Sequence, residues 1–148
     1  MRLKFLLPLV LLLSVSAFAQ DSMGHYAGTW NGVACIQSKS PMLGFLPLFT
    51  RLTIEPDGRA MFEMRSGDVN PPATAKLGPS NGLSVEFAVV NKDRVKFSLA
   101  FDGDSTKKLI GTQTIFYPDG ETLAAAATFY PSGGSLEDFA KDHDKICD

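Results

Sequence analysis

The feature that most constrains the fold is a period-two alternation of apolar and polar residues that recurs along most of the chain. In the clearest run, apolar residues occupy every second position from 95 to 101, and polar or small residues fill the positions between them. Successive side chains of a strand point to opposite faces, so each such run predicts a half-buried strand. One wet face is typical of antiparallel sheets, whereas parallel sheets are buried on both faces. The apolar positions are Ala60, Phe62, Met64; Leu83, Val85, Phe87, Val89; and Val95, Phe97, Leu99, Phe101.

Turn signals separate these runs and give about eight strands. Pro56-Asp57-Gly58 and Pro118-Asp119-Gly120 are turn tripeptides, in which proline fixes φ and glycine accepts a positive φ. Most links are short, so sequence neighbours are expected to pair as hairpins. The predicted strands are 26–36, 48–55, 59–65, 73–77, 83–90, 94–101, 107–117 and 121–130.

The strand order favours a barrel over a sandwich. The immunoglobulin sandwich places its tryptophan between two cysteines, but Trp30 precedes Cys35. Closing an up-and-down sheet on itself removes the exposed edges that promote aggregation. One helix is expected at 135–143, because Ser135 begins a capping pattern and Leu136 and Phe139 follow at helical spacing. The fold class is therefore all-β: an antiparallel up-and-down barrel of about eight strands with one short C-terminal helix.

The first residues predict export. Arg2 and Lys4 precede an apolar run, and small residues before Gln20 match a signal-peptidase site, so residues 1–19 are expected to be a signal peptide. Residues 20–148 then form a single domain that is secreted or periplasmic, with no transmembrane segment in the mature chain. Acidic residues outnumber basic ones, 16 to 14, and no basic patch is present, so no nucleic-acid partner is expected.

Two cysteines, Cys35 and Cys147, lie near opposite ends of the mature chain. In an oxidising compartment such a pair predicts a disulfide, which stabilises a chain by about 4–5 kcal/mol when the closed loop is this long. A redox-active or metal-binding pair normally has close spacing, and this pair does not. If Trp30 points into the barrel, Cys35 points outward, where a tail helix on the outer wall can bring Cys147 to it.

Trp30 is the single tryptophan and lies between Gly28 and Gly32 on the first strand. Glycines on either side of an inward tryptophan leave room for the indole and let the strand bend. Two interpretations remain open and are compatible with each other: Trp30 fills a solid core, or it forms the floor of a cup. An eight-stranded barrel can be filled by side chains or can hold one small ligand.

Gly28-Thr29-Trp30 resembles the Gly-x-Trp signature on the first strand of lipocalins and related calycins. The eight-strand count, the C-terminal helix and a disulfide that anchors the tail are also similar to that group. The resemblance covers most of residues 26–147. It implies a divergent lipocalin-like barrel and carriage of a small apolar ligand.

No catalytic motif is present. The chain has two histidines, and His143 lies between Asp142 and Asp144, which a helix directs to different faces. No nucleophile elbow, phosphate-binding glycine loop or zinc-protease motif occurs. We therefore expect no enzyme activity, no cofactor and no metal site.

The stretch from Gln37 to Leu48 is unusual because it is a long connection that is rich in apolar residues. Three interpretations stay open: extra core or a strand extension, a lid over an open barrel end, or an exposed patch for a protein partner or a membrane surface. The residues of this lid or interaction loop are Met42, Leu43, Phe45 and Leu46.

Two functions follow from these alternatives. The first is an exported, non-catalytic protein that binds a small hydrophobic ligand inside the barrel. The second is an envelope interaction or scaffolding module with a solid core, which contacts a protein partner through the 42–48 loop. A hollow interior favours the first and a packed barrel with an exposed loop the second. The candidate ligand-lining residues are Trp30, Phe62, Met64, Phe87, Phe97 and Leu99.

Overall fold

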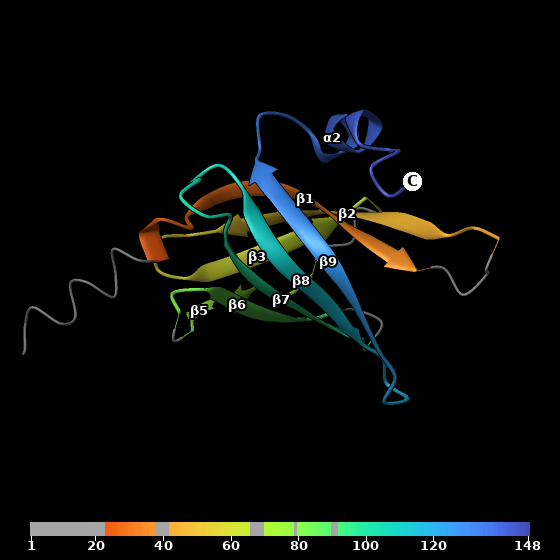
Figure 1. Cartoon of the computed structure of the whole chain (residues 1–148). Coiled ribbons are helices and arrows are strands. Elements are labelled where there is room, and N and C mark those ends of the chain that lie inside the picture. Colours follow the sequence, from red (N-terminus) through yellow and green to blue (C-terminus); the bar gives the residue numbers. More distant parts are fainter. Residues whose placement is uncertain (1–22, 38–41, 66–69, 79, 90–91) are drawn as a thin grey trace, which may run out of the picture.

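The computed structural model describes residues 23–37, 42–65, 70–78, 80–89 and 92–148, so the predicted signal peptide lies outside the described residues. Within them, all strands form one antiparallel sheet in the order β4-β3-β2-β1-β9-β8-β7-β6-β5 (Figure 1). The strands are β1 (Gly28–Gln37), β2 (Phe45–Ile54), β3 (Arg59–Met64), β4 (Ala73–Thr74), β5 (Lys76–Leu77), β6 (Leu83–Ala88), β7 (Arg94–Phe101), β8 (Leu109–Phe116) and β9 (Thr122–Pro131).

The two edge strands of this sheet adjoin in the chain. β4 and β5 stand at opposite ends of the strand order, yet only Ala75 separates them in sequence. Ala75 instead donates its backbone N–H to the carbonyl of Gly58, at 2.7 Å. The sheet therefore curls round until its edges meet, and the molecule is a nearly closed antiparallel barrel.

The predicted fold class is confirmed, with differences at the ends of strands. The single strand expected at 73–77 is split at Ala75 into β4 and β5, which pair with different neighbours. β1 begins at Gly28, so Tyr26 lies in the preceding turn and not on the strand, with its N–H bonded to the carbonyl of Met23. β2 begins at Phe45, so part of the long connection is a strand extension.

The core lies inside the barrel and follows the predicted alternation. Trp30 and Ala34 of β1 face inward, as do every second residue of β6 and β7. Cys35 faces outward, as expected from its position next to Ala34. The buried apolar residues of this core include Leu52, Ile54, Phe62, Leu83, Val85, Phe87, Val95, Phe97, Leu99, Leu109 and Phe129.

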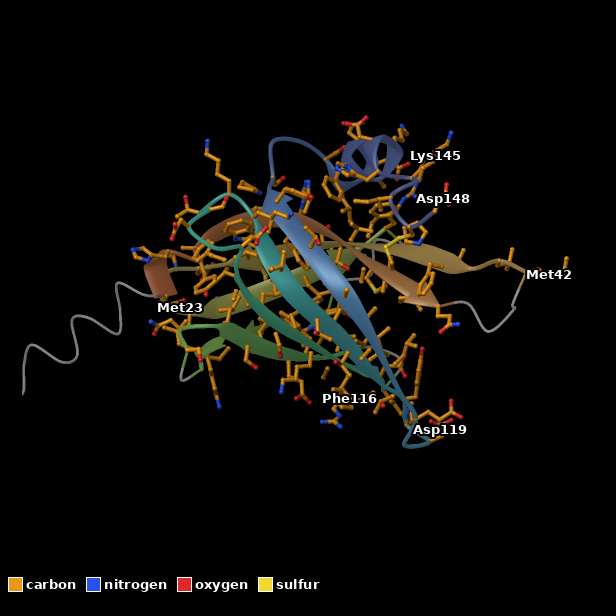
Figure 2. The ribbon with its side chains drawn as sticks, in the orientation of Figure 1. Met23, Met42, Phe116, Asp119, Lys145 and Asp148 are labelled. Atoms are coloured by element: carbon orange, nitrogen blue, oxygen red, sulfur yellow. A yellow bond between two sulfur atoms is a disulfide. The ribbon has the colours of Figure 1, made fainter. Side chains whose placement is uncertain are left out.

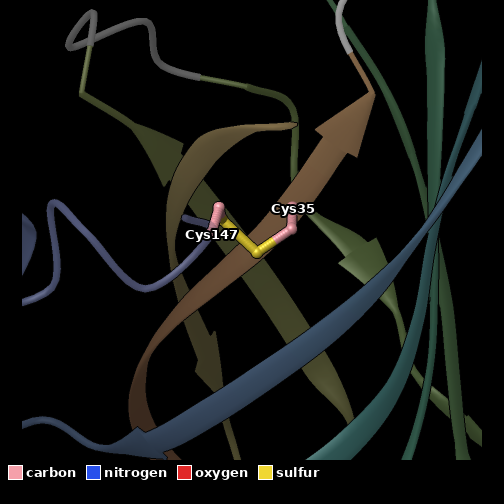
Figure 3. The surroundings of a disulfide bond; sticks show 2 residues. All are labelled: Cys35 and Cys147. Atoms are coloured by element: carbon pink, nitrogen blue, oxygen red, sulfur yellow. A yellow bond between two sulfur atoms is a disulfide. The ribbon is translucent and has the colours of Figure 1, made fainter. Parts of the chain in front are cut away.

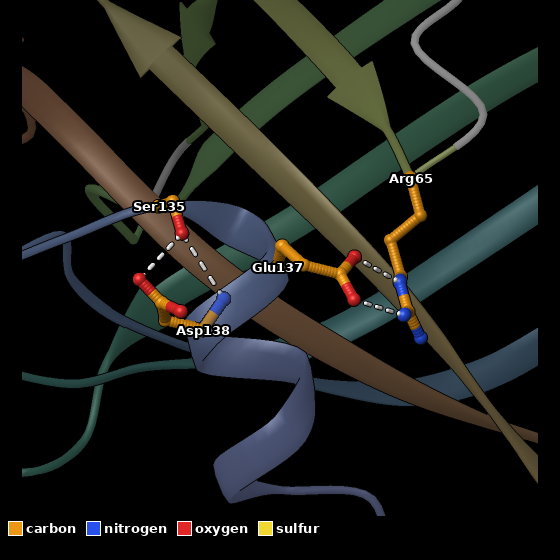
Figure 4. Close-up of polar contacts among 4 residues, drawn as sticks. All are labelled: Arg65, Ser135, Glu137 and Asp138. Atoms are coloured by element: carbon orange, nitrogen blue, oxygen red, sulfur yellow. Dashed lines mark hydrogen bonds and ion pairs between the residues drawn. The ribbon is translucent and has the colours of Figure 1, made fainter.

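Helix α2 (Leu136–Asp142) packs on the outer wall of the barrel, as predicted. Ser135 caps its first turn by accepting the N–H of Asp138 at 3.1 Å (Figure 4). Beneath α2, Val33 and Phe49 are neighbours on β1 and β2 and form a small second core with Ala140, Leu136 and Phe139. Glu137 also pairs through both carboxylate oxygens with Arg65, which follows β3, at 2.7 and 3.0 Å.

The predicted disulfide between Cys35 and Cys147 is present, with the two Cα atoms 5.5 Å apart. It joins the C-terminal tail to the outward face of β1 (Figure 3). Cys147 also packs against the second core, so the bond and the helix hold the tail to the same part of the wall.

Candidate functional site

One end of the barrel is sealed around Trp30. The indole N–H donates to the carbonyl of Tyr26 at 2.9 Å, and the Tyr26 hydroxyl donates to the carbonyl of Asn81 at 2.6 Å. Phe101 stacks on Tyr26 at 4.6 Å between ring centroids and lies 6.3 Å from Trp30. Burial raises the pKa of the Tyr26 phenol above its ordinary value of 10.0. Trp30 thus closes this end of the barrel, and both the indole N–H and the Tyr26 hydroxyl have hydrogen-bond partners.

The sequence suggested that the glycines beside Trp30 make room for the indole, and this part of the prediction is wrong. A Cβ built at Gly32 would overlap the ring of Phe129, which reaches across from β9. Gly28 has open space around it and adopts a φ of +136°, which suits the turn into β1. Gly32 therefore makes room for Phe129 and not for the indole.

The aromatic residues among the predicted ligand-lining residues contact one another at the centre of the barrel. Phe62 lies 4.6 Å from Phe87 and 5.8 Å from Phe97, and Phe97 lies 5.7 Å from Phe129, measured between ring centroids. Leu99 is buried in the same core, and Met64 is partly buried against it. Small inward residues face these rings from the wall formed by β1, β8 and β9. They are Gly32, Ala34, Gly111, Ala125 and Ala127.

Gln113 on β8 is the inward residue that sequence reasoning missed. Its side chain is 2 % exposed, and neither Nε2 nor Oε1 has a hydrogen-bond partner. A buried amide without partners destabilises a fold by about 1–3 kcal/mol for each unsatisfied group, and such groups are rare. The hydroxyl of Thr50 on β2 is similarly buried and unpaired. The sequence signal that could have identified Gln113 was a polar residue at a position where the alternation places an inward side chain.

The barrel wall separates close to Gln113. The β1–β9 ladder ends at the pair Ala34 and Ala127, although both strands continue. Beyond it, Cys35–Gln37 pair only with β2 and Thr122–Ala126 only with β8. We call this interruption the seam. Ala125, the first inward residue of β9 past the last pair, is the direct register partner of Gln113.

The loop residues predicted as a lid or interaction surface lie at the tip of the β1–β2 hairpin, which extends away from the barrel (Figure 2). We call residues 36–37 and 42–48 the arm. Met42 is 94 % exposed, Leu43 61 %, Phe45 52 % and Leu46 45 %. Phe45 and Leu46 belong to β2 and pair with Gln37 and Ile36. This placement favours the strand-extension and exposed-patch interpretations over a lid.

The remaining candidate groups are structural in the part of the chain that the structure describes. The His143 ring stacks on Phe139 at 4.1 Å, and its Nδ1 lies 2.8 Å from the Phe139 carbonyl. Among the described residues, no cluster of three or more His, Cys, Asp or Glu side chains is arranged to hold a metal ion. No described helix has the length and apolar character needed to cross a membrane.

No protein-family model matches the chain, and no curated protein is significantly similar to it in sequence. The nearly closed antiparallel barrel is compatible with a calycin fold, and the lipocalin resemblance stays a prediction.

Proposed function

We propose that this protein is a non-catalytic interaction module with a solid core, and that the arm is its contact surface for a protein partner. The observation that carries the proposal is the cluster of exposed apolar side chains on the arm, led by Met42, Leu43 and Phe45. Isolated exposed apolar residues are ordinary, but a contiguous group on a projecting element is typical of binding sites.

The packing of the barrel supports the same proposal. The ligand-carrier hypothesis requires space among Phe62, Phe87 and Phe97, yet these rings are fully buried and contact one another. Large rings from β3, β6 and β7 against small residues from β1, β8 and β9 fill a narrow barrel in the way that well-packed cores do. The aromatic centre of the barrel then provides rigidity, and the protein partner is bound by the surface.

The hairpin gives the arm a defined shape. Pairing of Phe45 with Gln37 and of Leu46 with Ile36 continues the β1–β2 ladder to its tip. A paired hairpin loses less conformational entropy on binding than a free loop, because its backbone is already ordered. The disulfide at Cys35 anchors the base of the arm, and a bond of this kind persists in oxidising compartments, which supports the proposed export.

The test uses a photo-crosslinking amino acid, p-benzoylphenylalanine, placed at Phe45. The matched control places it at Asp119, which is exposed at the tip of the β8–β9 hairpin. In an extract of the producing cells, we expect one discrete adduct from position 45 and none from position 119. Excess unlabelled wild-type protein should compete the adduct away, whereas a folded Leu43→Ser/Phe45→Ser variant should not. Equal adducts from both positions, or competition by the double variant, would contradict the proposal.

A further inference from the structure

The proposed function of the arm does not explain why Gln113 places an unpaired amide inside the barrel. Its amide carries two N–H donors and a carbonyl acceptor, all enclosed and all without a partner. Folded proteins pair nearly all buried polar groups, and those that stay unpaired call for a specific explanation. A leucine or methionine would fill the same space without this penalty, so the amide is expected to have a partner in some state of the protein.

The surroundings of Gln113 differ from the aromatic centre of the barrel. Phe97 flanks it on β7, but on β9 its neighbour is Ala125, and Gly111 precedes it by two residues on its own strand. Ala127 and Ala34, the last pair of the β1–β9 ladder, continue this small-residue wall. On the other side, Ile115 follows Gln113 by two residues on β8 and packs against the core. The short side chains are thus those of Gly111 and Ala125, and a small molecule beside them would displace little protein.

The seam supplies a route to this position. Past Ala34 and Ala127, no ladder hydrogen bonds join β1 to β9, although all of Cys35–Gln37 and Thr122–Ala126 are described. Strands that share no ladder bonds can move apart without breaking backbone pairing. Ile36 of β1, which is partly buried against the core, and Ala125 of β9 are the inward residues that flank the seam, and Gln113 is the register partner of Ala125.

We propose that Gln113 is the polar anchor of a small binding site reached through the seam, for ligands with a short apolar body and a primary carboxamide or uncharged carboxylic acid head. Such a head offers a donor beside an acceptor, which is the complement of the glutamine amide and allows two parallel hydrogen bonds. A carboxylate is excluded because no cation is paired with Gln113 to offset the desolvation of a buried charge. The site forms as the seam opens, since the Gln113 amide is enclosed in the closed barrel.

The proposal is tested with hexanamide, hexanoic acid and N,N-dimethylhexanamide, which keeps the chain and the carbonyl but has no N–H donor. Binding is followed through the Gln113 side-chain amide signals in ¹H–¹⁵N NMR spectra and by calorimetry. We expect hexanamide to bind one site per chain and to shift these signals. The dimethyl analogue should bind at least about tenfold more weakly, because it leaves the Gln113 carbonyl unpaired. Hexanoic acid should bind only at a pH low enough to keep it protonated.

Two variants on β8 complete the test. Gln113→Met keeps the shape without the amide, and Thr112→Met places the same side chain at the adjacent exposed position, outside the seam and the arm. We expect Gln113→Met to weaken hexanamide binding at least about tenfold and to raise the melting temperature by a few degrees, with Thr112→Met unchanged in both. Unmoved Gln113 signals at saturating hexanamide, equal binding by Gln113→Met, or carboxylate binding as tight as that of the amide would each overturn the proposal.

Discussion

The two ends of β1 show how one strand can serve opposite purposes. From Trp30 to Ala34, β1 pairs with β2 on one side and β9 on the other, and Trp30 and Tyr26 both find hydrogen-bond partners. From Cys35 to Gln37 it pairs with β2 alone, beside the seam and at the base of an arm with exposed apolar side chains. The first end is sealed, and the second is incompletely paired.

The difference indicates where stability and binding reside. Regions with full backbone pairing and dense packing open only on global unfolding, whereas regions with fewer contacts open locally at lower free energy. Binding surfaces are commonly placed on the less constrained part of a rigid scaffold. Both proposals, for the arm and for Gln113, fall at the incompletely paired end, so substitutions at the two ends should differ in kind.

The largest effect is expected at the sealed end. Trp30→Ala should lower the free energy of unfolding by about 3–5 kcal/mol, because it leaves a large cavity beside the stacked rings of Tyr26 and Phe101. Trp30→Phe, which keeps a ring but loses the bond to the Tyr26 carbonyl, should lose less. Urea denaturation followed by circular dichroism measures both. A loss below about 1 kcal/mol for Trp30→Ala would mean that this end is not the stable one.

Removal of the disulfide should have the next largest effect and act at the other end. Cys35→Ser/Cys147→Ser should lower the free energy of unfolding by about 2–4 kcal/mol without unfolding the barrel, which has its own core. Hydrogen exchange should speed up in α2 and at Cys35–Gln37 while Trp30 stays protected. Faster exchange at Trp30 as well would show that the two ends unfold together.

Tyr26→Phe sharpens the comparison through pH. At neutral pH it should destabilise the fold by about 1 kcal/mol, since the hydrogen bond to the Asn81 carbonyl is lost. Burial raises the folded-state pKa of Tyr26 above 10.0, so stability from the protonated phenol is complete below pH 10 and declines as pH rises through the folded value. The difference in the free energy of unfolding between wild type and Tyr26→Phe should therefore become smaller above pH 10. Denaturation curves at pH 7 and across the alkaline range give this difference, and a constant difference would contradict the assignment.

The smallest effect on stability is expected on the arm. Leu43→Ser/Phe45→Ser should change the free energy of unfolding by no more than about 0.5 kcal/mol, because both side chains are already mostly exposed. The measurement is thermal melting beside that of the wild type. A destabilisation of several kcal/mol would mean that these side chains pack against the protein in solution and are not a free surface.

Much of the architecture was predictable because alternation and turn chemistry are local signals. The runs at 59–65, 83–90 and 94–101 gave both the strands and their inward faces, and the capping pattern at Ser135 gave the helix. The two cysteines gave the disulfide, since no other pairing was available. The break at Ala75 was not predictable in this way, because it depends on where the sheet closes and not on the local sequence.

The candidate sites were less accessible to sequence reasoning. The arm was identified as unusual, but whether it covers the barrel or projects from it depends on tertiary contacts. Gln113 was missed because its strand has a weak pattern, with exposed Ile110 outside and Gly111 inside. Hydrophobicity alone does not say which face of such a strand is buried. The seam depends on the register between the first and last strands, which no local pattern encodes.

The pairing of β1 with β9 also has a consequence for the order in which the molecule is made. Trp30 meets Pro131 and Ala34 meets Ala127, so this wall joins the two extremes of the domain. β1 is the first strand to be synthesised, but its second edge stays unpaired until β9 has been made. Contacts between residues so far apart in the sequence form slowly. Until then the β1–β2 hairpin presents an open edge to other chains. The barrel can therefore close only after β9 has emerged from the ribosome, or from an export channel if the chain passes through one.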